Sequence, residues 1–191
     1  MASAPAVFAD TNVLVSTMLR NILLELSAAG AIRIHWSAEV LTELRATHQK
    51  FNPGMLVVDL HQREQAMNAT FPEALVSPVA HNTLAASLPD ANDVHVLAAA
   101  VAVPCDFIAT FNLKHFPPTE LAREANTVRA IHPDAMLLTL ITTAPEQTLS
   151  ALFAAQSTFK APPLTDDAFH ALLAKIGLPQ SANLLRRLGQ A

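Results

Sequence analysis

Between residues 6 and 131, short apolar runs alternate with longer segments in which apolar residues recur at helical spacing. The short runs predict strands over 6–9, 32–36, 75–76, 106–110 and 127–131. The intervening segments predict helices over 12–29, 37–49, 55–71, 89–103 and 119–125. Such alternation gives a central parallel sheet with helices on both faces, so the predicted fold class is a three-layer α/β/α domain.

The pattern changes at Pro133. From there the sequence predicts only helices, which proline and glycine residues separate, over 134–142, 146–156, 166–176 and 181–188. We therefore predict two parts, an α/β domain over 1–132 and an all-helical C-terminal extension over 133–191. The sequence leaves three roles open for the extension: dimerisation, covering a cleft, or binding a partner protein.

Composition narrows the class of protein. The chain has 191 residues, of which 51% are hydrophobic and 15% charged, so it is globular rather than disordered. Its net charge of −4 gives no overall basic field for nucleic acid. Cys105 is the only cysteine, which excludes an internal disulfide and fits a cytoplasmic location. We expect neither a signal peptide nor a membrane span, because no basic N-terminal region and no long uncharged apolar segment occur.

Polar residues stand where a site would form in such a fold. Asp10 follows the first strand, and Asn112 follows the strand that ends near Thr110, so both belong at the carboxyl edge of the sheet. Glu43 lies in the helix after the second strand, and Asp93 stands at a helix start. Clustered carboxylates repel one another and are costly to bury without cations. An all-oxygen cluster suits Mg²⁺ or Mn²⁺, which activate water in phosphodiester hydrolysis.

Each of these residues also has an ordinary structural explanation. Asp10 is a suitable N-cap, and Asp93 suits the first turn of a helix, where it stabilises the helix dipole. Asp90 follows a proline and suits a turn, Asn112 suits a turn or a cap, and Glu43 suits a solvated helix face. The joint placement of these residues, rather than any single one, favours a metal site.

Four segments, in this order, resemble the motifs of PIN-domain ribonucleases. They are Asp10-Thr11-Asn12-Val13-Leu14, Leu41-Thr42-Glu43-Leu44, Asp93-Val94-His95-Val96-Leu97-Ala98-Ala99-Ala100 and Ile108-Ala109-Thr110-Phe111-Asn112-Leu113-Lys114-His115-Phe116-Pro117. The chain is most similar to the longer bacterial VapC-like toxins that carry a helical C-terminal extension. That similarity spans nearly the whole chain and includes Arg20, Trp36-Ser37, His132-Pro133-Asp134 and Phe159-Lys160-Ala161-Pro162-Pro163.

The resemblance implies a metal-dependent endoribonuclease. Asp10, Glu43 and Asp93 match the acids that hold Mg²⁺ or Mn²⁺, and Asn112 matches a fourth catalytic position. Asp90 is a candidate outer-shell or alternative ligand. The chain departs from the pattern at His115, where relatives commonly have Asp, and at Val94, where they often have Arg. The change at His115 weakens the metal site, alters its metal preference, or provides an outer-shell or RNA contact.

RNA requires cations around an acidic centre, and the candidates nearest the motifs are Arg20, Arg45 and Lys114. Arg20 could instead form a structural ion pair with Glu43 or Asp93. The resemblance further implies tRNA or ribosomal RNA as substrate, a cognate antitoxin protein as partner, and a homodimer as one option. The competing hypothesis is a PIN-fold module that binds RNA or protein without cleaving it, which the His115 departure and the negative net charge favour.

Overall fold

A computed structural model describes residues 3–54, 56–77, 80, 84, 87–124, 127–160 and 162–189. Its centre is a five-stranded sheet in the order β3-β2-β1-β4-β5, in which every pairing is parallel. The strands are β1 (Ala6–Ala9), β2 (Arg33–Ser37), β3 (Leu75–Val76), β4 (Phe107–Ala109) and β5 (Arg129–Ile131). The predicted α/β class and all five predicted strands are confirmed.

The first strand occupies the middle of the sheet. Val7 pairs with Ile34 on one side and with Phe107 on the other. All four β1 residues are buried, which agrees with their uninterrupted apolar sequence, because a central parallel strand is covered on both faces. The residues that follow β1 and β4 therefore emerge side by side at the carboxyl edge.

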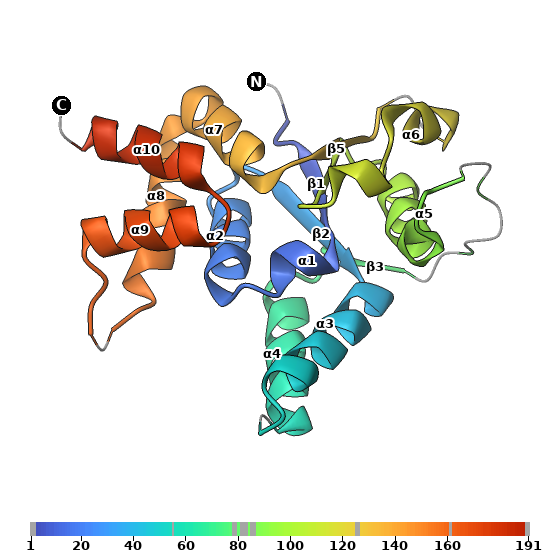
Figure 1. The fold of residues 1–191 in the computed structure, drawn as a ribbon, viewed down its shortest axis with the longest axis horizontal. Coiled ribbons are helices and arrows are strands. Elements are labelled where there is room, and N and C mark those ends of the chain that lie inside the picture. The colour runs from blue at the N-terminus through green and yellow to red at the C-terminus, as the bar shows by residue number, and fades with distance from the viewer. Residues whose placement is uncertain are drawn as a thin grey trace.

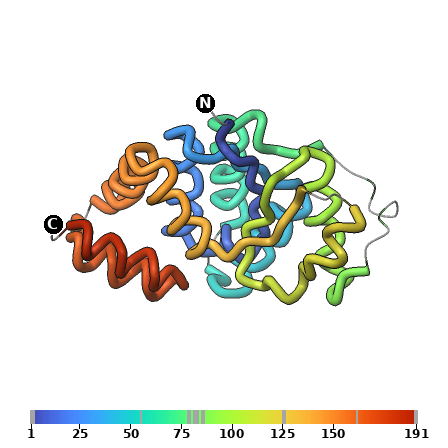
Figure 2. The backbone as a smooth tube through the Cα atoms, turned by 90° about the horizontal axis from the view of Figure 1, so that it is seen from above, coloured from blue at the N-terminus to red at the C-terminus, as the bar shows by residue number. Residues whose placement is uncertain are grey.

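Helices lie on both sides of this sheet, with α2 on one side and α5 on the other (Figures 1 and 2). The apolar α5 contacts β1, β2 and β4, which explains why its sequence carries almost no polar residues. The helices before the extension are α1 (Thr11–Leu14), α2 (Thr17–Ala28), α3 (Ala38–Phe51), α4 (Val57–Thr70), α5 (Val94–Ala102) and α6 (Pro118–Glu124). Short 3₁₀ turns, η2 and η3, cover Ala91–Asp93 and Leu113–His115.

The prediction of one helix over 12–29 is wrong. The segment divides into α1 and α2, because the Ser16 side chain accepts a hydrogen bond from the backbone N–H of Leu19 and caps a new helix. The stretch predicted as a helix from residue 89 is likewise a 3₁₀ turn followed by α5. The predicted ends at Met55 and Ala125 and the motif residue Ala161 lie outside the described residues.

The C-terminal part is helical as predicted, with α7 (Pro133–Thr143), α8 (Pro145–Ser157), α9 (Asp166–Lys175) and α10 (Pro179–Leu188). Helix α8 packs on α2, and α10 packs on α7 and α9, so this part lies beside the sheet domain at the α2 side (Figures 1 and 2). Buried residues of both parts form one continuous hydrophobic core. The division at residue 132 stays a prediction. None of the described helices is both long and apolar enough to cross a bilayer.

Cys105 provides a test of this packing. Its side chain is fully buried just before β4, and burial together with the Asp106 charge raises the pKa of the thiol to about 12. The thiolate is the reactive form, so the folded protein should not react with a disulfide reagent at about pH 8, whereas the unfolded protein should react fully. Thiol titration with and without guanidinium chloride measures this. Rapid labelling of the native protein would contradict the burial.

Candidate active site

Asp10 lies at the carboxyl end of β1 and is buried, with 5% of its surface exposed. It occupies the N-cap position of α1, but its side chain makes no capping hydrogen bond. Instead, its Oδ2 accepts hydrogen bonds from Thr110 Oγ1 at 2.7 Å and from Asn12 Nδ2 at 2.5 Å. The capping alternative therefore does not explain this carboxylate, which is held toward the end of β4.

The segment after β4 is fixed to the segment after β1 by the Asn12 side chain. Asn12 Nδ2 also donates to Thr110 Oγ1 at 2.9 Å, and its Oδ1 accepts from the backbone N–H of Phe111 at 3.0 Å. The backbone N–H of Asn112 donates to Thr110 Oγ1 at 3.0 Å. Asn112 then precedes η3, in agreement with the turn alternative, although its side chain does not form a cap.

Glu43 projects from α3, whose start is fixed by the Ser37 side chain, which accepts a hydrogen bond from the backbone N–H of Val40. Its two carboxylate oxygens have different partners. Thr11 Oγ1 donates to Oε2 at 2.5 Å, and His95 Nε2 lies 2.9 Å from Oε1. With 44% of its side chain exposed, Glu43 remains accessible to a ligand.

A second cluster surrounds Asp93 at the start of α5. His115 Nδ1 lies 2.8 Å from Asp93 Oδ2 and 4.0 Å from Asp90 Oδ2. One ligand atom from each of these three residues lies within 4.8 Å of the others, which is close enough for a shared metal ion. Asp90 also accepts a hydrogen bond from the backbone N–H of Asn92 at 3.0 Å, so it has the predicted turn role as well.

Electrostatic coupling joins these groups. Burial raises the pKa of Asp10, the charges of Asp93 and Glu43 raise it further, and hydrogen bonds from Thr110 and Thr11 oppose the shift. Burial also raises the pKa of Asp93, His115 opposes this, and the charges of Asp90 and Glu43 add to it. The folded chain therefore brings the three predicted acids into one electrostatic neighbourhood, despite their separation in sequence.

Glu43 shows the opposite shift. Burial raises its pKa, but hydrogen bonds from His95 and Thr11 and the charge of His95 outweigh burial, so the pKa is lowered. Burial lowers the pKa of His95, yet its hydrogen bond and charge interaction with Glu43 dominate and raise it. This pair therefore favours a carboxylate beside a protonated imidazole.

The donor set fits a divalent cation. The ionised forms of Asp10 and Asp93 are unfavourable in the folded protein, because both side chains are buried near other carboxylates. A bound cation would offset this unfavourable energy. Three carboxylates suit Mg²⁺ or Mn²⁺, whereas the nearby imidazole of His115 is a better ligand for later transition metals than for Mg²⁺. Among the described residues, the three side chains whose ligand atoms lie close enough to share an ion are Asp90, Asp93 and His115, whereas Asp10 and Glu43 are joined to Asp93 through the interaction of their charges. The set Asp10, Glu43 and Asp93 stays a prediction.

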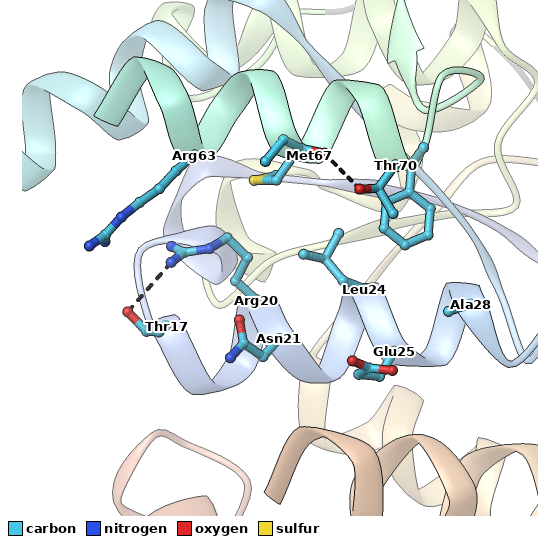
Figure 3. Close-up of a pocket in the computed structure, with 11 residues that line it drawn as sticks. Thr17, Arg20, Asn21, Leu24, Glu25, Ala28, Arg63, Met67 and Thr70 are labelled. Atoms are coloured by element: carbon cyan, nitrogen blue, oxygen red, sulfur yellow. Dashed lines mark hydrogen bonds between the residues drawn. The ribbon is translucent and has the colours of Figure 1, made fainter. Parts of the chain in front are cut away.

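The three predicted RNA-binding cations lie in different environments. Lys114 is exposed in η3, between Asn112 and His115. Arg45 forms an ion pair with Glu64 of α4. Arg20 is buried, with 7% exposure, at a groove of about 520 Å³ between α2 and α4 (Figure 3). Its Nη1 donates to the carbonyl of Leu14 at 2.7 Å, and no ion pair with Glu43 or Asp93 is found among the described residues.

Comparison with known proteins identifies the family. Residues 6–114, more than half of the chain, match the family model described as a PIN domain. The chain belongs to the PIN-domain family. Residues 133–187 of this PIN-domain chain match a second family model, described as the VapC50 C-terminal domain. No solved structure gives a significant match.

One curated relative of this PIN-domain chain is a Mycobacterium tuberculosis protein named "Putative ribonuclease VapC50". The two are 39% identical over 98 residues, which cover 50% of this chain and 55% of the relative. The chain thus spans about half the length of the curated relative it matches.

Sequence reasoning missed several residues that hold the acids of the PIN domain in place. Thr11, Asn12 and Thr110 bond to Glu43 or Asp10, and His95 bonds to Glu43. The first three lie inside the motif segments. Small polar side chains just after a strand could therefore have been predicted from the sequence to bond the site acids. His95 is the one polar residue of the apolar helix α5, and its partner Glu43, 52 positions away, is identified only by the fold.

The raised pKa of Asp10 predicts the stability of the metal-free protein. A folded-state pKa above the unfolded value means that the ionised carboxylate opposes folding at neutral pH. This cost begins to shrink as the pH falls through the folded-state pKa and is gone below the unfolded-state pKa. Asp10→Asn should therefore raise the free energy of unfolding at neutral pH, and its advantage should shrink on acidification. Thermal unfolding in EDTA across this pH range measures the difference.

Asp59→Asn is the control, because Asp59 is an exposed carboxylate in the first turn of α4. Mn²⁺ should raise the Tm of the wild type and of this control but not that of Asp10→Asn. An equal Mn²⁺ effect on all three proteins would contradict the site.

Proposed function

We propose that this chain is a metal-dependent endoribonuclease that hydrolyses RNA phosphodiester bonds. The carrying observation is an acidic cluster at the carboxyl edge of the sheet. Asp90, Asp93 and His115 lie close enough to share an ion, and the charges of Asp93 and Glu43 add to the burial that raises the pKa of Asp10. Membership of the PIN-domain family and similarity to a protein named as a ribonuclease support the same function. The ion we propose is Mg²⁺ or Mn²⁺.

In the proposed mechanism, Asp10, Glu43 and Asp93 would hold the ion. The chemistry that a divalent ion supplies is a lowered pKa of water and neutralisation of phosphate charge. Thr110 and Asn12 orient the Asp10 carboxylate, and Thr11 and His95 orient Glu43. His115 holds Asp93, with Asp90 as an outer-shell or alternative ligand. Asn112 positions the attacking water or the substrate by hydrogen bonding.

We further propose that the nuclease is the toxin of a type II toxin–antitoxin pair that acts in the cytoplasm on tRNA or ribosomal RNA. The extension supports this, because residues 133–187 match a domain named after a VapC protein. Lys114 is the strongest candidate for an RNA contact, since it is exposed beside the site. Arg45 and Arg20 would have to exchange their present partners, Glu64 and the Leu14 carbonyl, to bind RNA. A reading frame for a small antitoxin beside the gene, or a toxin homodimer in solution, would support the assignment further.

Activity tests the proposal directly. The purified protein should cleave RNA with Mn²⁺ or Mg²⁺ and stop when EDTA is added. Asp10→Asn should lower kcat/KM by at least about 100-fold, the scale on which one lost electrostatic element acts. The measurement is the initial rate on a fluorescent single-stranded RNA, with Asp59→Asn as the matched control. Cleavage that persists in Asp10→Asn or in EDTA would refute the assigned site.

The alternative function is a PIN-fold module that binds RNA or protein with weakened catalysis. The observation that favours it is the contact of His115 with Asp93, because the imidazole takes up the Asp93 Oδ2 that a metal ion would bind. His115→Asp separates the two functions. The variant loses a hydrogen bond and gains a repelling carboxylate, so its Tm without metal should fall, whereas its stabilisation by Mg²⁺ should increase.

If the protein is a weakened module, the wild type should bind RNA without cleaving it, and His115→Asp should restore cleavage. A wild type that already cleaves with Mg²⁺ would reject this alternative. His61→Asp is the matched control, because His61 is an exposed histidine of α4.

A further inference from the structure

The turn between α9 and α10 reaches the site side of the PIN domain. In Figure 1 this turn lies at the end of the helical pair that faces the sheet, whereas the C-terminus lies at the outer end. Gly177 ends α9 with φ +94°, a left-handed conformation that favours glycine. The backbone N–H of Leu178 donates to the Leu173 carbonyl at 2.9 Å, so the turn is a closed, defined structure.

Phe111 packs directly against this glycine. A Cβ added at Gly177 would lie 2.7 Å from Phe111 Cε1 and 3.3 Å from Cζ. Any larger residue would therefore push the ring away. The Phe111 ring also contacts the His132 ring in a T-shaped arrangement, at a centroid distance of 5.1 Å. The ring thus contacts both the residue that caps α7 and the α9–α10 turn.

The backbone of Phe111 belongs to the site. Its N–H donates to Asn12 Oδ1 at 3.0 Å, and Asn12 Nδ2 donates to Asp10 Oδ2. Asn112, the proposed positioning residue for water or substrate, is the next residue in the chain. A displacement of Phe111 would therefore move Asn112 through the peptide bond that joins them. It would also disturb Asp10 through the Asn12 side chain, which bonds to both residues.

Hydrogen bonds to α7 anchor the start of α10, directly after the α9–α10 turn. Asp134 in the first turn of α7 is buried, with 2% exposure. Its Oδ1 accepts from the Ser181 backbone N–H at 2.9 Å and from Ser181 Oγ at 2.6 Å, and its Oδ2 accepts from the Gln180 backbone N–H at 3.0 Å. A carboxylate thus satisfies the N-terminus of α10, where the helix dipole favours negative charge.

We propose that the C-terminal extension is a positioning element of the active site, which fixes Asp10 and Asn112 through the contact between Gly177 and Phe111. This assigns the extension a role in the chemistry of the chain itself, beyond any role in binding a partner. The inference rests on the proposed function for its kinetic readout, but the coupling itself has a readout that does not depend on that function.

The test compares two glycines. Gly30 also has a positive φ, +74°, but nothing lies within 4 Å of an added Cβ, and it precedes β2 at the opposite edge of the sheet from the site. Gly30→Ala therefore carries the backbone strain of Gly177→Ala without the contact to Phe111. Both variants should lose Tm, and only Gly177→Ala should change the site.

Three readouts are expected to change in Gly177→Ala and to stay at the wild-type level in Gly30→Ala. The amide resonance of Phe111 in ¹⁵N–¹H NMR spectra should shift, because its hydrogen bond to Asn12 is disturbed. Mn²⁺ affinity, measured from the electron paramagnetic resonance of free Mn²⁺, should fall severalfold. The kcat for RNA cleavage should fall roughly tenfold to a hundredfold with little change in KM, as expected for a small misplacement of reacting groups.

Phe111→Leu completes a double-mutant cycle and remains informative if Gly177→Ala fails to fold. Because the smaller side chain leaves room for a Cβ, adding Gly177→Ala to Phe111→Leu should cost no further Mn²⁺ affinity or kcat. Additive losses, or equal effects of Gly177→Ala and Gly30→Ala, would overturn the proposal. A wild type that neither binds Mn²⁺ nor cleaves RNA would refute the proposed function instead, and the Phe111 resonance would still decide the coupling.

Discussion

The parallel pairing of β1 with β4 is the constraint on which the site depends. This register aligns Ala9 with Ala109 and brings Asp10 and Thr110, which are 100 positions apart in sequence, within hydrogen-bonding distance. The backbone N–H of Asp10 donates to the Ala109 carbonyl at 3.1 Å, so the ladder continues to the residue that carries the carboxylate. A shift of one residue would reverse the side chains of β1 and separate Asp10 from its donors.

Burial of the acids has both a structural cost and a chemical use. The sheet is covered by helices on both sides, so Asp10 leaves water almost completely, and Thr110 and Asn12 compensate only part of that cost. The pKa of Glu43 shifts in the opposite direction, because His95 stabilises its charged form. The ionised forms of Asp10 and Asp93 are thus disfavoured and that of Glu43 is favoured. In the proposed nuclease, a cation would stabilise the two disfavoured charges.

The helical extension belongs to the same structural unit as the site. Its residues join the core of the sheet domain, Asp134 binds α10 to α7, and the α9–α10 turn holds Phe111 beside Asn112. Side chains of the sheet domain and of the extension therefore pack in one core, whichever residue divides the two parts. The family models end and begin on either side of β5, yet contacts across that point support the segment after β4.

The sequence by itself determined the α/β class and the strands, because apolar periodicity is a local property. It also singled out Asp10, Glu43 and Asp93, whose role as metal ligands stays a prediction. It did not determine the break at Ser16, where a side-chain cap competes with helix continuation. Only the tertiary structure decided which donors hold each acid, the pairing of Glu43 with His95 and Asp93 with His115, and the contact of Gly177 with Phe111. Those contacts join residues far apart in the chain, and their partners are chosen by packing and register, which no local pattern encodes.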